Sequence, residues 1–124
     1  SGDTLALTTL TFEVQTGEIL DADVEVNSFA ASNKLTTTDT NVRSDLQSIV
    51  THEAGHFLGL AHSKDPTATM NANYSPGNVS FRSLSPDDEA AICAAYPPDR
   101  DVAACSAPIT EICPCGQMKR KRGS

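Results

Sequence analysis

The sequence predicts a single α+β domain in which two strands precede two helices. Three observations support this prediction. Apolar and polar residues alternate in residues 5–14 and 20–26, which is the pattern of half-buried strands. Residues 44–58 carry an apolar stripe with helical spacing. Residues 85–96 begin with a serine–proline pair and are followed by two prolines, which indicates a second helix.

The first strand contains an irregularity in its alternation. Its apolar residues change phase between Leu7 and Leu10, which are separated by Thr8 and Thr9. One extra residue in a strand produces such a shift, so the pattern predicts a β-bulge at Thr8-Thr9.

The second strand, residues 20–26, alternates apolar residues with Asp21, Asp23 and Glu25. We expect this acidic row on the solvated face of the strand, and a calcium site built from these carboxylates is the alternative. Residues 28–40 are rich in serine, threonine and asparagine, and are expected to form a weak strand and a loop.

Both predicted helices have recognisable N-terminal signals. Ser44 is expected to cap the helix at 44–58, with Gln47 completing a capping box. Ser85 is expected to cap the helix at 85–96, where a proline and three acids follow it. The apolar stripe of the first helix is expected in the core and consists of Leu46, Ile49, Val50, Ala54, Phe57 and Leu58.

The first helix also carries a candidate metal site. His52 and His56 are four residues apart, so both imidazoles lie on one helical face and can bind one ion. Gly59 can end the helix and turn the chain, which brings His62 to the ion as a third ligand. Three protein ligands are the usual set of a catalytic zinc site. Glu53 is expected to act as a general base beside the metal.

These five residues match the pattern HExxHxxGxxH, and here the chain resembles a metzincin metalloprotease. Ser63 after the third histidine and the sequence LSPDD at residues 84–88 resemble the matrixins, the family of matrix metalloproteinases. Residues 68–74 resemble the matrixin Met-turn, and residues 45–51 resemble bacterial members of the family.

The resemblance implies a zincin-like catalytic domain with a small, mostly parallel sheet, an edge strand, an active-site helix, a Met-turn and a C-terminal helix. It places Met70 beneath the metal and Tyr74 in the wall of the substrate pocket, and suggests that Asp87 or Asp88 holds the Met-turn. The family's N-terminal strand and helix have no counterpart here. We expect the catalytic core in residues 1–98, without those N-terminal elements. A cysteine-containing extension with a basic tail is expected in residues 99–124.

The function that the resemblance implies is that of a secreted zinc metalloendopeptidase acting on protein substrates. One zinc ion is expected, since the motif uses all three histidines of the chain. Matrixins bind structural calcium, which keeps the calcium alternative open. The alternative function is that of a catalytically weak or inactive zinc-binding module. Without its N-terminal elements, such a domain would cover its exposed apolar surface by self-association or by binding the missing segment.

Charge and cysteine content narrow the remaining possibilities. Sixteen acidic against nine basic residues give no reason to expect nucleic-acid binding. No apolar run is long enough to span a bilayer. The basic run at residues 119–122 is interpreted as a solvated tail, with a targeting signal as the alternative. The chain has four cysteines, Cys93, Cys105, Cys113 and Cys115. They indicate disulfides formed in an oxidising compartment, and the sequence leaves their pairing open. A second zinc site is the alternative.

Overall fold

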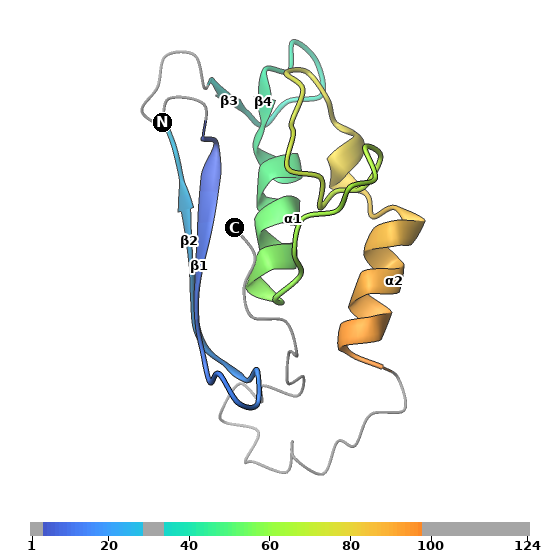
Figure 1. Cartoon of the computed structure of the whole chain (residues 1–124). Helices are drawn as coiled ribbons and strands as arrows, with labels where there is room; N and C mark the ends of the chain where they lie inside the picture. Colours follow the sequence, from blue (N-terminus) through green and yellow to red (C-terminus); the bar gives the residue numbers. More distant parts are fainter. Residues whose placement is uncertain (1–3, 29–33, 98–124) are drawn as a thin grey trace, which may run out of the picture.

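The computed structural model describes residues 4–28 and 34–97, which form two small sheets and two main helices (Figure 1). The expected domain boundary at residue 98 and three of the four cysteines lie outside these residues; Cys93 is exposed on the last helix. The elements are β1 (Ala6–Phe12), β2 (Ile19–Val26), β3 (Leu35–Thr36), β4 (Ser44–Asp45), α1 (Leu46–Phe57), the 3₁₀ helix η1 (Ser80–Arg82) and α2 (Pro86–Ala95).

The strands β1 and β2 form an antiparallel hairpin that runs alongside α1 (Figure 1). A tight turn joins them: the Gly17 amide donates to the Glu13 carbonyl at 2.8 Å, and Gly17 has a φ of 76°. So short a connection permits only an antiparallel pair. The other pair, β3 with β4, is parallel but only two residues long. The expectation of a mostly parallel sheet is therefore wrong for the described residues.

The predicted bulge at Thr8-Thr9 is also wrong. Thr8 pairs regularly with Val24, and the register shifts instead between Thr11 and Phe12. Thr8 is only 2% exposed, so the strand keeps one phase and buries a threonine on its inner face. The apparent change of phase arose because a polar residue occupies a core position.

The acidic row of β2 is exposed at all three positions, Asp21, Asp23 and Glu25, as expected for the solvated face of a strand. The apolar face of this strand is covered only in part, and Leu20 remains 62% exposed. The hairpin thus presents apolar surface to solvent.

Helix α1 begins one residue later than expected. Asp45 is its N-cap, and the Asp45 carboxylate accepts hydrogen bonds from the Ser48 amide at 3.0 Å and the Ser48 hydroxyl at 2.6 Å. The predicted capping box of Ser44 and Gln47 is wrong because Ser44 belongs to β4, where it pairs with Leu35. Aspartate is as good an N-cap as serine.

Helix α2 has the N-terminus that the sequence predicted, with a full capping box between Ser85 and Asp88. Its inner residues pack on a core centred on Leu60 and Met70. Partly buried apolar residues complete this core; they are Ile19, Ala91, Ile92, Ala95 and Tyr96. None of the described helices is long and apolar enough to cross a bilayer.

Candidate metal centre and active site

The three histidines of the motif converge on one point. His52 and His56 lie one turn apart on α1, and His62 lies on the segment that follows the helix. Gly59 makes this possible: its φ is 87°, and its amide donates to the His56 carbonyl at 2.7 Å, so the chain leaves the helix in the left-handed conformation. One ring nitrogen from each histidine lies within 4.8 Å of the others.

The second nitrogen of two of these rings is bound to a backbone carbonyl. The Nδ1 atom of His52 lies 2.6 Å from the Thr69 carbonyl oxygen, and that of His56 lies 2.7 Å from the Leu60 oxygen. A carbonyl only accepts hydrogen bonds, so each Nδ1 carries the proton and each Nε2 has a free lone pair. This is the tautomer in which an imidazole binds a metal through Nε2.

The spacing of one pair of these nitrogens is close to the value expected for two ligands of one zinc ion. The Nε2 atoms of His56 and His62 are 3.0 Å apart, and two nitrogens bound to one zinc ion lie about 3.3 Å apart at ordinary zinc–nitrogen distances. Burial lowers the pKa of His56, and the neighbouring histidines lower it further, which favours the neutral form. Desolvation also lowers the pKa of His62. Neutral, convergent imidazoles suit zinc among the common biological metals.

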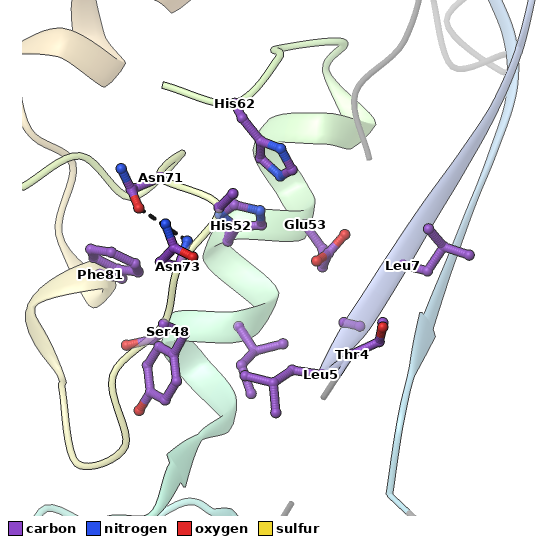
Figure 2. A pocket seen from close by; sticks show the side chains of 14 residues that line it. Thr4, Leu5, Leu7, Ser48, His52, Glu53, His62, Asn71, Asn73 and Phe81 are labelled. Carbon is purple, nitrogen blue, oxygen red and sulfur yellow. Dashed lines mark hydrogen bonds between the residues drawn. The ribbon is translucent and has the colours of Figure 1, made fainter. Parts of the chain in front are cut away.

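Glu53 lies beside the histidines but its side chain points toward β1 (Figure 2). The residue is 5% exposed and lines the same cleft as His52 and His62. The Thr8 hydroxyl donates to the Oε2 atom of Glu53 at 2.5 Å. Thr8 was not identified from the sequence as part of the site. A hydroxyl at a core position of a strand that packs on the helix is the feature that could have indicated it.

Met70 lies directly against α1. It is buried, and a Cβ atom placed on Gly55 would fall 2.1 Å from the Met70 sulfur. The turn that carries Met70 is fixed from below by Asp88, whose carboxylate accepts hydrogen bonds from the amides of Thr69 at 2.8 Å and Met70 at 3.0 Å. Of the two aspartates expected to hold this turn, Asp88 makes the hydrogen bonds to it.

The Asp88 carboxylate stays charged although it is only 1% exposed. Burial alone would raise its pKa, but hydrogen bonds from Ser85, Thr69 and Met70 outweigh burial and lower the pKa below its usual value. The other aspartate, Asp87, accepts a hydrogen bond from the hydroxyl of Ser63, the residue after His62. Helix α2 therefore contacts, through both aspartates, the two segments that adjoin the three histidines.

A cleft of about 500 Å³ opens in front of the histidines. One side is formed by the start of β1, the floor by α1, and the other side by residues 71–74 and Phe81 (Figure 2). Tyr74 is among the residues that line this cleft. Its hydroxyl accepts from the Asp45 amide at 2.9 Å and donates to the Asn78 carbonyl at 2.7 Å, which ties the wall of the cleft to the start of α1.

An ion-pair network supports the same wall. The Arg82 guanidinium contacts both carboxylate oxygens of Asp45, at 2.9 and 2.7 Å, and Asp39 at 2.7 Å. The bond from Arg82 lowers the pKa of the buried Asp45 to about 2, against the effect of burial. A bidentate guanidinium–carboxylate pair is directional, so it fixes η1 against the N-terminus of α1.

These features define the chain as a domain of helices and small sheets in which three histidines, two on α1 and one on the segment after it, could hold a metal ion beside a cleft. The family model of the matrixins matches residues 5–97. The chain belongs to the matrixin family.

Individual relatives match over shorter stretches. Human neutrophil collagenase is 46% identical over 61 residues, which cover 49% of this chain and 13% of that protein. Metalloendoproteinase 1-MMP of Arabidopsis thaliana is 40% identical over 58 residues, covering 47% of this chain and 16% of the relative. Human matrilysin is 50% identical over 38 residues, which cover 31% of this chain and 14% of that protein. The matches thus span only a small part of each relative. No solved structure matches the chain significantly.

Proposed function

We propose that the chain is a zinc-dependent endopeptidase that hydrolyses peptide bonds of protein substrates. The observation that carries this proposal is the convergence of His52, His56 and His62 beside the carboxylate of Glu53 at the base of a cleft. The matrixin membership and the collagenase and metalloendoproteinase relatives support the same activity.

In this proposal each site residue has a defined role. The three histidines hold one zinc ion, with the Nδ1 protons of His52 and His56 engaged by carbonyls so that Nε2 faces the metal. Bound zinc supplies Lewis acidity, which makes water acidic near neutral pH and polarises a carbonyl. Glu53 accepts a proton from the attacking water and returns it to the nitrogen of the leaving amine, so the base is regenerated after the bond is cleaved.

The remaining residues shape the site. Gly59 turns the chain toward His62, Met70 forms the floor beneath the histidines without binding the metal, and Tyr74 lines the pocket for the substrate side chain that follows the cleaved bond. The position of Tyr74 in the cleft wall supports this last role. An extracellular location belongs to the same proposal and rests on the four cysteines.

The test is cleavage of casein, an unstructured protein, by the purified chain with and without a zinc chelator. Glu53→Gln removes the base and keeps the shape of the side chain, whereas Glu89→Gln makes the same change at an exposed position of α2. We expect chelator-sensitive cleavage that falls by at least about 100-fold in Glu53→Gln and is unchanged in Glu89→Gln, with one zinc ion per chain in all three proteins.

Absence of cleavage in the zinc-loaded chain would overturn the peptidase proposal. The exposed apolar side chains of the hairpin, Leu20 and Val24, would then favour the alternative function of a zinc-binding interaction module.

A further inference from the structure

We propose that Thr8 is a positioning residue that holds the Glu53 carboxylate in place for proton transfer; this inference rests on the proposed peptidase function. The two residues are 45 positions apart in the sequence, and their contact joins β1 to α1. No residue of the HExxHxxGxxH pattern lies on β1, so the pattern by itself gives no indication of this contact.

The geometry makes Thr8 a specific partner. Its hydroxyl has one proton to donate, and the shorter of its two contacts, 2.5 Å, is to the Oε2 atom of Glu53. The longer contact, 3.3 Å, is to the carbonyl oxygen of the same residue. A hydrogen bond from a hydroxyl to a carboxylate is charge-assisted and short, so the proton is donated to the side chain.

The environment of Thr8 fixes the direction of this donor. The residue is 2% exposed, and regular pairing with Val24 holds its backbone in β1. Threonine is branched at Cβ, which restricts its side chain to few rotamers. The donor is therefore already oriented toward Glu53 before a substrate enters the cleft.

The contact has a chemical consequence for the base. Because Oε2 already accepts from Thr8, Oε1 is the less engaged oxygen, and we expect it to accept the proton from water. A glutamate has three rotatable side-chain bonds, and the hydrogen bond removes much of their freedom. Small displacements of a catalytic group lower the rate strongly, so loss of the hydroxyl should act on turnover rather than on substrate binding.

The experiment compares kcat, KM and zinc content of the full chain and three variants, with casein-derived peptide as substrate. Thr8→Val keeps the shape of the side chain but has no hydroxyl, and Thr8→Ser keeps the hydroxyl. Thr9→Val makes the same replacement at the neighbouring, exposed position of β1.

For Thr8→Val we expect kcat to fall by about 10- to 100-fold, with KM within about threefold and one zinc ion retained. Thr8→Ser should recover kcat to within about threefold of the original, and Thr9→Val should leave it unchanged. A Thr8→Val enzyme with the original kcat would overturn the positioning role, while chelator-sensitive activity lost in Glu53→Gln would leave the peptidase proposal intact.

A zinc-loaded wild-type chain without activity would overturn both proposals together. If Thr8→Val does not fold, Thr8→Ser and Thr8→Ala provide the same comparison, since both side chains are smaller than threonine. Equal kcat values in these two variants would overturn the role of the hydroxyl.

Discussion

Gly55 lies so close to Met70 that a Cβ atom on the glycine would fall 2.1 Å from the methionine sulfur. Gly55 is the fourth residue of the HExxH segment and faces the turn that carries Met70. The absence of a side chain at this position thus allows the methionine to pack directly against α1.

Gly55→Ala should destabilise the chain despite the better helix propensity of alanine. Alanine in a helix gains about 1 kcal/mol over glycine, whereas overpacking of a filled core costs about 1–3 kcal/mol. Met70 is 3% exposed and has little room to move. We therefore expect a lower free energy of unfolding, measured by urea unfolding of the zinc-free chain. In a Met70→Ala background the same change should become neutral or stabilising, and a penalty that persists there would contradict the contact.

Asp88→Asn should destabilise the chain by about 2–4 kcal/mol, because the buried carboxylate accepts hydrogen bonds from the amides of Ser85, Thr69 and Met70. An asparagine would direct an NH₂ group at some of these donors. Glu89→Gln, the same chemical change at an exposed position of α2, should alter stability by less than about 0.5 kcal/mol. Equal unfolding free energies of the two variants would show that the Asp88 contacts contribute little.

The stability of the zinc-free chain should fall in acid through the Asp45–Arg82 pair. The pKa of Asp45 is lowered to about 2, below its value in an unfolded chain. The pair therefore stabilises the fold above about pH 4, and this contribution, about 2 kcal/mol, is lost as the pH falls toward about 2.

Arg82→Gln should lower the free energy of unfolding near neutral pH. It should also reduce the change of this free energy with pH between about pH 4 and pH 2. Arg43→Gln, at an exposed arginine, should leave the pH dependence of the unfolding free energy as it is in the original chain. Urea unfolding across this pH range measures both effects, and parallel curves for the original and Arg82→Gln chains would argue against the ion pair.

Ser63→Ala should weaken zinc binding by about 10-fold without removing a ligand. Ser63 follows His62, and its hydroxyl connects this segment to Asp87 of α2. Asp87→Ala should weaken binding by a similar factor, and the double variant should be no weaker than either single one. Competition with a chromogenic chelator measures the zinc Kd, and Ser75→Ala at an exposed serine is the control; additive losses would show that the two residues act separately.

The local pattern of the chain predicted the elements that carry the candidate site. The spacing of His52, His56 and His62 and the position of Gly59 were enough to anticipate a bend that brings the three rings together. Ser85 was correctly predicted as a cap. These predictions succeed because they concern neighbours along the chain, whose geometry follows from helical periodicity and from the left-handed conformation of glycine.

Long-range contacts could not be predicted in the same way. Ser44 was a plausible cap until its pairing with Leu35 placed it in a strand. Thr8 was assigned to a bulge because a threonine is unexpected on a buried strand face, and only the opposing Glu53 explains it. The carbonyl partners of the histidines are backbone atoms, and backbone atoms have no signature in a sequence.

The three histidines of the proposed metal site all lie within residues 52–62, whereas the hydroxyl that contacts the Glu53 carboxylate comes from a strand 45 positions away. If the chain is the zinc peptidase proposed above, metal loading and competence for turnover are therefore two separate requirements in the assembly of the molecule. A preparation would then be able to bind its full complement of zinc while the hairpin of some molecules is not docked on α1. Metal analysis then counts loaded chains, and only titration with a tight-binding inhibitor counts working ones.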